Sequence, residues 1–590
     1  MTPQEALHTY FGYDSFRPLQ EEIINSVLAG RDTLALMPTG GGKSLCFQIP
    51  TLVMSRENPN LQTLKPSNPQ TLKQREARLC LVITPLIALM KDQVENLQAH
   101  GIHAAAVYTG MSYDRQRVVL DNCLWGPYHF LYCSPERLES EEFRRRLADL
   151  PVCLIAVDEA HCISQWGYDF RPSYLHIAAI RRLLPGVPVL ALTATATPPT
   201  IDDIQVRLGF REKNVLRQSF HRANLRYIVR RTADKGEQTV HILGRVAGSA
   251  IVYVRNRKRA EELSRWLNGE FEGLSGKPPC RKVCDFYHAG LPPSERAARQ
   301  ESWKSGKTRV IVATNAFGMG IDKADVRVVI HYDLPSSMEA YYQEAGRAGR
   351  DGLPAYAVLL YNEKEDKMKA LKRIGDSYPP KEFVEKVYHK TCDFLQVGAG
   401  SGLGHTFTLH TDQLCHVMHL PILQTYSALH LLTQAGYICF EEDHETLPRV
   451  RINVPRYQLG EYHLSREQAE MLDLLMRRYA GIYTDLQYIR EAEEKNNHRI
   501  LVSLAQRGII TYIPRSVGCS LTFTREREAE IHLSPVVYDN RREIYAEKMQ
   551  AMVEYAHQTR LCREQVLLSY FGETNAVPCG HCDVCRGKDS

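Results

Sequence analysis

The stretch TLALMPTGGGKSLCFQI, residues 33–49, decides the fold. An apolar run is followed by a glycine-rich loop, by Lys43 and Ser44, and then by a second apolar segment. Glycines let backbone N–H groups approach phosphates, and the N-terminus of a following helix supplies positive potential. The stretch therefore predicts a strand, a phosphate-binding loop and a helix. The residues expected to contact a nucleotide are Thr39, Gly40, Gly41, Gly42, Lys43 and Ser44.

In this loop Lys43 would reach the outer phosphates, and Ser44 would hold Mg²⁺. Met37 stands where the motif usually has its first glycine. A glycine-rich loop can also be a plain turn, but Gly-Lys-Ser between a strand and a helix favours nucleotide binding.

Further short apolar runs alternate with amphipathic segments on both sides of this loop, which predicts two parallel sheets covered by helices on both faces. In the first unit the expected strands are residues 33–37, 79–84, 129–133, 153–158 and 188–194, with a surface insertion at 55–78. In the second unit they are residues 250–254, 283–288, 309–315, 326–333 and 355–361. The expected fold class is α/β, with two tandem parallel-sheet lobes at 1–210 and 211–362, and ligands are expected in the cleft between them.

The sequence VDEAH, residues 157–161, places an acidic pair after an apolar strand. Asp158 can hold Mg²⁺ through water, and Glu159 beside it can orient and deprotonate the attacking water. The alternative is a helix N-cap. In YYQEAGRAGRDG (341–352), Arg347 and Arg350 share one face and could neutralise charge on the γ-phosphoryl, as arginine fingers do. The alternative for these two residues is a surface ion-pair face. Together the motifs indicate an NTPase whose site is split between two lobes.

In their order, these motifs resemble those of superfamily-two helicases, and in detail those of the RecQ family. The resemblance implies that the two parallel-sheet lobes are RecA-like. FGYDSFRPLQEEII (11–24) resembles the adenine-reading motif, which implies nucleotide contacts for Tyr13, Arg17 and Gln20. Residues 84–94 and 132–138 resemble motifs that bind the DNA strand, and ALTATAT (191–197) resembles the element that links hydrolysis to lobe closure. VATNAFGMGIDKADVR (312–327) resembles a second-lobe motif touching DNA and nucleotide, which implies a DNA contact for Thr314 and nucleotide contacts for Gly320 and Asp322.

HCISQWGYDFRPSY (161–174) resembles the aromatic-rich loop that RecQ proteins carry after the DEAH box. The resemblance implies DNA contacts for Trp166, Phe170 and Arg171, since bases stack on aromatic faces without sequence preference. Core packing is the alternative role for these aromatics. Tyr168 stands where the family usually has histidine, which puts the tightness of coupling between DNA and hydrolysis in question.

Cysteines crowd at the C-terminal end: the chain has 16, and the last four are Cys562, Cys579, Cys582 and Cys585. Two C-x-x-C steps sharing Cys582, with a distant fourth thiolate, suit tetrahedral Zn²⁺ in a structural site, and an iron–sulfur cluster is the minor alternative. His581 is expected to face solvent. The segment resembles the RecQ zinc-binding module, predicted here as residues 536–590, although in the familiar arrangement this module directly follows the second lobe.

Residues 363–535 are predicted to form a winged-helix-like accessory region of one module or of two in series. TYSALHLLTQAGYICFEE (425–442) indicates a helix and a strand, and residues 498–526 repeat the pattern with two strands joined by a turn at PRSVG. A small α+β scaffold without a ligand is the alternative.

The net charge of +5 permits a nucleic-acid partner without arguing for one. No apolar run is long enough to span a membrane, and the N-terminus lacks an export signal pattern, so a cytoplasmic protein is expected, at the nucleoid in a bacterium or nuclear in a eukaryote. The leading expectation is an ATP-dependent DNA helicase that uses ATP, Mg²⁺ and Zn²⁺ and moves 3′ to 5′ on single-stranded or tailed DNA. It would act in repair, recombination or replication, with single-strand-binding or recombination proteins as partners. The alternatives are an RNA helicase, a translocase that remodels nucleoprotein without unwinding, and a DNA-binding module with a relict ATPase.

Overall fold

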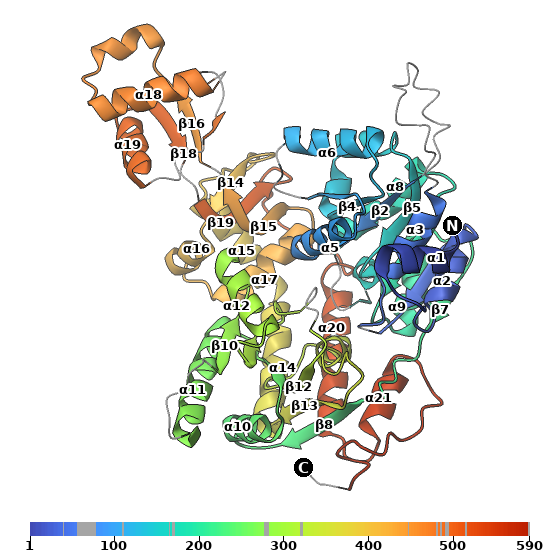
Figure 1. Ribbon diagram of the computed structural model, residues 1–590. Helices are drawn as coiled ribbons and strands as arrows, with labels where there is room; N and C mark the ends of the chain where they lie inside the picture. The colour runs from blue at the N-terminus through green and yellow to red at the C-terminus, as the bar shows by residue number, and fades with distance from the viewer. Residues whose placement is uncertain are drawn as a thin grey trace. The chain divides into compact units, whose positions relative to one another are not determined.

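The computed structural model forms two compact units, residues 1–371 with 543–590, and residues 372–542 (Figure 1). It describes residues 1–38, 40–55, 78–108, 111, 113–164, 166–167, 171–275, 283–318, 323–446, 448–479, 482–483, 487–489, 495–513 and 516–587. Most of the predicted insertion at 55–78 lies outside these residues. No helix in the described part of the chain is both long enough and apolar enough to cross a membrane.

The first lobe is a parallel sheet with strand order β3-β4-β2-β5-β6-β1-β7. Its strands are β1 (Thr33–Leu36), β2 (Leu79–Ile83), β3 (Ala104–Val107), β4 (Phe130–Cys133), β5 (Val152–Val157), β6 (Val189–Thr193) and β7 (Val215–Arg217). The central strands are buried on both faces because separate apolar cores cover the two sides of the sheet, which explains their continuous apolar sequences. The sequence predicted five of these strands; edge strands β3 and β7 were not predicted.

Helices connect these strands and cover both faces of the sheet. They are α1 (Pro3–Ala6), η1 (Leu7–Phe11), α2 (Gln20–Leu28), α3 (Leu45–Met54), α5 (Ile87–Ala99), α6 (Tyr113–Trp125), η3 (Pro135–Glu139), α7 (Glu141–Leu147), η4 (Ala160–Ile163), η5 (Pro172–His176), α8 (Ile177–Leu183) and α9 (Pro198–Arg207). The phosphate loop lies between β1 and α3, as predicted from the sequence. Because all strands are parallel, their carboxyl ends share one edge, where α/β folds bind ligands.

The second lobe is a parallel sheet with strand order β10-β11-β9-β12-β13-β8. Its strands are β8 (Leu225–Arg231), β9 (Ser249–Tyr253), β10 (Cys284–Tyr287), β11 (Val310–Ala313), β12 (Val326–His331) and β13 (Ala355–Tyr361). Its helices are α10 (Lys235–Arg245), α11 (Arg257–Ser275), α12 (Pro293–Lys304) and α13 (Met338–Ala345). Strand β8 was not predicted from the sequence: it contains three arginines, and its residues alternate between buried and half-buried at the edge of the sheet.

The C-terminal module packs on the second lobe although about 175 residues separate them in the chain. It includes the end of α20 (Asp539–His557) and α21 (Arg563–Tyr570). Met549, Met552 and Val553 of α20 share one apolar core with Tyr341 and Leu359 of the second lobe. Helix α14 (Glu363–Ser377) contributes Ala370 to the same core. The C-terminal module is therefore far from the second lobe in sequence but in direct contact with it in the structure.

The second unit is an α+β region with two small antiparallel sheets, ordered β14-β19-β15 and β17-β16-β18. Its strands are β14 (Thr406–Leu409), β15 (Ile438–Thr446), β16 (Arg449–Ile452), β17 (Gln487–Tyr488), β18 (Ile510–Ile513) and β19 (Ser516–Phe523). Its helices are α15 (Lys381–Phe394), α16 (Thr411–Val417), α17 (Ile422–Gln434), η6 (Arg456–Glu461), α18 (Arg466–Arg478) and α19 (Lys495–Gln506).

Strands β18 and β19 lie on either side of the turn predicted at PRSVG, but they do not pair as a wing would, because they belong to different sheets. Strand β18 pairs with β16, and β19 pairs with β14 and β15. The pairing follows the apolar faces: Leu521 and Phe523 pack in one core with Phe440, whereas Ile510 packs in the other with Val450. The second module is therefore inserted between β15 and β19 of the first rather than placed after it.

Candidate functional site

The phosphate loop has the backbone conformation that only glycine adopts without strain. Gly40 and Gly42 have φ angles of 81° and 80°. A Cβ on Gly42 would also lie 2.4 Å from Gln20 Nε2, so the loop could not keep this approach with any larger residue. The backbone N–H of Leu45 donates to Gly42 O at 3.2 Å, which starts α3 directly from the loop. Thr39 lies outside the described residues.

The predicted adenine-reading residues surround this loop. Gln20 is buried; its Oε1 accepts from the Arg17 backbone N–H at 2.8 Å and its Nε2 donates to Gly42 O at 2.9 Å. The Arg17 guanidinium donates to Gly40 O. The ring of Tyr13 is 56% exposed, so its face is accessible for stacking. The structure thus brings Arg17 and Gln20 to the phosphate loop and leaves Tyr13 open.

Asp158 follows β5 at the same edge of the sheet as the phosphate loop. Its Oδ1 accepts from the Glu159 backbone N–H at 2.9 Å, and Thr84 Oγ1 lies 3.5 Å from its Oδ2. Burial and the neighbouring Glu159 charge raise the pKa of Asp158 to about 6, and the Lys43 ammonium opposes that shift. A divalent cation would favour the ionised carboxylate in the same way as Lys43 does. The hydroxyl of Ser44 and the carboxylate of Asp158 are oxygen donors of the kind Mg²⁺ prefers, so this pair fits the ion.

Glu159 is held in a left-handed conformation, with φ 47° and ψ 45°, which is uncommon for a residue other than glycine. Its side chain is almost fully buried and its Oε2 lies 3.3 Å from His161 Nδ1. A line of polar contacts continues from there: His161 Nδ1 lies 3.0 Å from Thr193 Oγ1, which donates to Thr195 O at 3.2 Å. Gln343 of the second lobe donates to Thr195 Oγ1 at 3.4 Å. The acidic pair is thereby connected to the second lobe.

The two arginines of the second lobe follow α13. Arg350 lies against the phosphate loop, since a Cβ on Gly40 would come within 3.4 Å of its Cγ. Arg347 is buried, and one of its Nη atoms would lie 3.4 Å from a Cβ on Gly318. The backbone between them is fixed by Arg222, which donates to the carbonyls of Ala348 and Gly349 at 3.0 and 3.1 Å. The arginines therefore face the cleft between the lobes.

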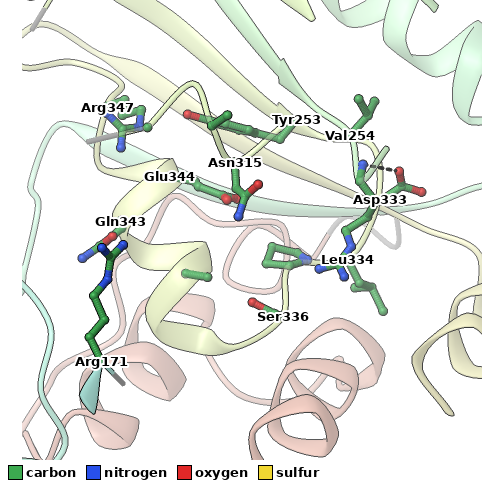
Figure 2. Close-up of a pocket in the computed structure, with 15 residues that line it drawn as sticks. Arg171, Tyr253, Val254, Asn315, Asp333, Leu334, Ser336, Gln343, Glu344 and Arg347 are labelled. Atoms are coloured by element: carbon green, nitrogen blue, oxygen red, sulfur yellow. Dashed lines mark hydrogen bonds between the residues drawn. The ribbon is translucent and has the colours of Figure 1, made fainter. Parts of the chain in front are cut away.

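A cavity of about 450 Å³ opens at the carboxyl ends of β9, β11 and β12 (Figure 2). Its lining residues from the second lobe include Tyr253, Asn315, Asp333, Gln343 and Arg347, and Arg171 enters from the first lobe. Thr314, a predicted DNA contact, is buried directly before Asn315. Gly320 and Asp322 lie outside the described residues.

The aromatics after the DEAH box divide between two roles. Tyr174 is fully buried and its hydroxyl donates to Asp158 O at 3.0 Å, so it packs in the core behind the acidic pair. Trp166 is 46% exposed, as a base-stacking residue must be. Arg171 is fixed by its Nη1, which donates to Pro85 O at 3.2 Å. Tyr168 and Phe170 lie outside the described residues.

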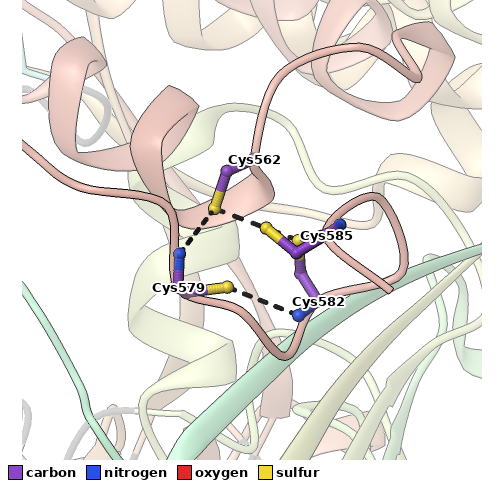
Figure 3. Close-up of side chains that lie close together, drawn as sticks. All are labelled: Cys562, Cys579, Cys582 and Cys585. Atoms are coloured by element: carbon purple, nitrogen blue, oxygen red, sulfur yellow. Dashed lines mark hydrogen bonds between the residues drawn. The ribbon is translucent and has the colours of Figure 1, made fainter. Parts of the chain in front are cut away.

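The four C-terminal cysteines meet in one cluster (Figure 3). Their Sγ atoms all lie within 4.8 Å of one another, and those of Cys562 and Cys582 are 3.9 Å apart. Four sulfurs about 2.3 Å from one zinc would be separated by similar distances. Backbone N–H groups of Cys579, Cys582 and Cys585 each donate to a cluster sulfur at 3.3 Å, which favours thiolates. The set fits a structural Zn²⁺. His581, expected to face solvent, is half-buried with its Nε2 3.3 Å from Leu225 O.

Several residues of this site had no local signal in the sequence. Arg222 and Gln343 belong to it only because distant segments meet. Outside the nucleotide site, Lys548 of α20 also had no local signal, and its Nζ lies 2.5 Å from Trp166 O and 2.7 Å from Glu339 Oε1. In the sequence Lys548 has the features of an ordinary surface lysine on an amphipathic helix.

Three family models match the chain. Residues 17–204 match the DEAD/DEAH box helicase domain, residues 234–352 the helicase conserved C-terminal domain, and residues 527–586 the RecQ zinc-binding domain. Among solved structures, the DUF1998 helicase MrfA bound to DNA is similar with a TM-score of 0.50 and 19% identity, covering 61% of this chain and 48% of that one. This structural likeness concerns the fold alone.

Curated relatives are closer in sequence. The ATP-dependent DNA helicase RecQ of Pasteurella multocida is 41% identical over 361 residues, 61% of this chain and 52% of that protein. RecQ of Bacillus subtilis is 41% identical over 367 residues, 61% of this chain and 56% of that protein. The chain thus spans about half the length of these relatives. The two helicase domains, the zinc-binding domain and this level of identity together show that the chain belongs to the RecQ family of superfamily-two helicases.

Proposed function

We propose that the chain is an ATP-dependent DNA helicase that hydrolyses ATP in the cleft between its two lobes. The observation that carries the proposal is the placement of Arg350 from the second lobe against Gly40 of the phosphate loop. A nucleoside triphosphate in that loop would have Lys43 on one side and Arg350 on the other. Opening and closing of the cleft would then depend on which nucleotide occupies it.

In this mechanism the residues of the first lobe bind ATP and activate the attacking water. Those of the second lobe stabilise the negative charge that develops on the γ-phosphoryl. Lys43 and the loop N–H groups hold the phosphates, and Ser44 with Asp158 would hold Mg²⁺, which shields the phosphate charge when bound. Glu159 orients a water and accepts its proton. Arg347 and Arg350 compensate negative charge that develops on the γ-phosphoryl. Tyr13, Arg17 and Gln20 recognise the base.

Three residues of the cleft are proposed to contact DNA. Trp166 would stack on a base, and Arg171 and Thr314 would contact the backbone. The names of the relatives support DNA over RNA as the track, and the aromatic-rich loop supports it too. Movement 3′ to 5′, roles in repair, recombination or replication, and partners such as single-strand-binding protein belong to the proposal. So do cytoplasmic or nuclear location and the domain bounds 1–210, 211–362, 363–535 and 536–590.

Strand displacement with ATP and Mg²⁺ tests this function on three duplexes: DNA with a 3′ tail, DNA with a 5′ tail, and RNA with a 3′ tail. We expect opening of the 3′-tailed DNA alone, and none with Lys43→Ala, which should still bind DNA. Opening of the RNA would make the chain an RNA helicase. DNA-stimulated hydrolysis without opening of any duplex would make it a translocase.

A further inference from the structure

A chain of polar contacts links three helices of the first unit to the backbone of Trp166. The ammonium of Lys548, on α20, lies 2.5 Å from Trp166 O and 2.7 Å from Oε1 of Glu339, on α13. The other oxygen of Glu339 accepts from the hydroxyl of Tyr570, on α21, at 3.1 Å. Lys548 therefore joins the aromatic-rich loop of the first lobe to the second lobe and, through Glu339, to the C-terminal zinc-binding module.

This junction is shielded from water. The side chains of Lys548 and Glu339 are only 12% and 4% exposed. An ion pair this deep keeps its place only if its polar atoms are hydrogen-bonded, and here each Glu339 oxygen has a donor while Lys548 has two acceptors. Burial and the Glu339 charge raise the pKa of Tyr570, so its hydroxyl stays protonated and donates.

The Trp166 backbone is held from its other side by the first lobe. Its N–H donates to Ser164 Oγ at 3.2 Å, and Ser164 in turn donates to Asp203 Oδ2, on α9, at 2.7 Å. The next residue, Gly167, is packed so tightly that a Cβ would lie 2.2 Å from His161 O. The main chain at Trp166 is thus held between α9 and α20 while the residue as a whole remains 46% exposed.

We propose that Lys548 is a positioning residue for Trp166: it fixes the stacking ring at the cleft and makes that position depend on the second lobe and the zinc-binding module. This inference rests on the proposed function, because it assumes that Trp166 stacks on DNA. A base that stacks on the indole would then shift the Trp166 backbone. This shift would be transmitted to His161 in the first lobe and, through Lys548, to α13 in the second. Movement of the second lobe would in turn shift the ring.

The test compares four variants for ATP hydrolysis with and without single-stranded DNA. Lys548→Met removes the ammonium and keeps most of the aliphatic stem. Lys548→Met with Glu339→Gln also removes the carboxylate charge that the first change leaves buried. Lys548→Arg keeps a cation that can reach both acceptors. Lys369→Met is the matched control, since Lys369 forms a half-exposed ion pair with Glu365 on α14 and does not touch the loop.

We expect unchanged basal hydrolysis in Lys548→Met and in the double variant. The DNA concentration for half-maximal stimulation should be about ten- to hundredfold higher in both, the effect of losing one hydrogen bond to a charged group. Lys548→Arg and Lys369→Met should resemble the wild type. A second measurement does not depend on ATP hydrolysis. In the absence of DNA, backbone amide exchange of the peptide containing Trp166 and Gly167 should become faster in Lys548→Met and in the double variant. Zinc content and melting temperature are measured on each.

The proposal would be overturned if Lys548→Met and the double variant both kept the DNA dependence and the amide exchange of the wild type. Equal loss of basal and stimulated hydrolysis in the charge-neutral double variant, with lower melting temperature, would also overturn it, because Lys548 would then be structural. Failure of the proposed function would give a different result: DNA would not stimulate ATP hydrolysis by the wild-type protein. The exchange measurement then decides the positioning role by itself.

Discussion

Arg350 of the second lobe lies against Gly40 of the phosphate loop, close enough that a Cβ on Gly40 would come within 3.4 Å of Arg350 Cγ. The two residues come from separate sheets, and each sheet has its own apolar cores. Because these residues lie close together, the proposed nucleotide site contains residues of both lobes. Hydrolysis should therefore depend on the approach of the lobes as well as on the residues of either lobe.

Arg350→Ala should lower kcat for ATP hydrolysis by about 10³ and change KM much less, since the guanidinium acts on charge that develops in the transition state. Arg350→Lys should recover only part of the loss, because an ammonium lacks the planar fork. Steady-state phosphate release measures both. Arg245→Ala, at an exposed arginine on α10, is the control. A rise in KM with unchanged kcat would mean that Arg350 only binds ATP.

Asp158→Asn should raise the melting temperature above pH 7 in the absence of Mg²⁺ and nucleotide. The pKa of Asp158 is raised to about 6 by burial and by Glu159, so the ionised carboxylate destabilises the fold. A raised carboxyl pKa contributes stability below the unfolded value, near 3.9, and this contribution is lost as pH rises through the folded value.

The stabilisation by Asp158→Asn should therefore be small at pH 4 and complete above pH 7, reaching up to about 3 kcal/mol. Thermal melts of both proteins from pH 4 to pH 8 measure it. Adding Mg²⁺ should narrow the difference, because the cation favours the ionised carboxylate. A gain that is the same at every pH would place its cause in packing rather than in charge.

Trp166→Ala should raise the DNA concentration for half-maximal stimulation of hydrolysis, since one stacked base contributes about 1–3 kcal/mol. The backbone contact with Lys548 is retained in this variant, so the ring is tested separately from its position. Trp125→Ala is the matched control, because Trp125 is also on the first lobe and is 49% exposed, against 46% for Trp166. Equal effects of the two changes would argue against stacking at Trp166.

Cys582→Ser should remove the bound zinc and lower the melting temperature by about 5 °C or more, because metal binding and folding of such modules are coupled. The loss should reach the second lobe, since Phe571 of the module packs on Phe220 and Tyr342 with ring centroids 4.8 and 5.3 Å apart. Metal analysis and thermal melts measure the two effects. Cys439→Ser, at a cysteine outside the cluster, should keep the zinc. Full stability without zinc would contradict a structural role.

Local sequence was sufficient for elements whose pattern is set by burial. Strands β1, β2, β4, β5 and β6 are continuous apolar runs because both faces of the sheet are covered. The glycines of the phosphate loop and the spacing of Cys579, Cys582 and Cys585 reflect local geometry, a left-handed backbone in one case and a tetrahedral ligand set in the other. Strand β3, a short run of alanines and one valine at the sheet edge, carried too weak a signal.

The amino-acid sequence by itself determined the two lobes, the phosphate loop, the acidic pair and the cysteine cluster, because each depends on residues near one another in the chain. Only the tertiary structure decided that β19 pairs with β15 rather than β18, that the zinc-binding module packs on the second lobe, and that Lys548 reaches Trp166. The physical reason is the same in the three cases. The free energy of burying an apolar face or a charge depends on the partner that covers it, and here each partner lies far away in the chain.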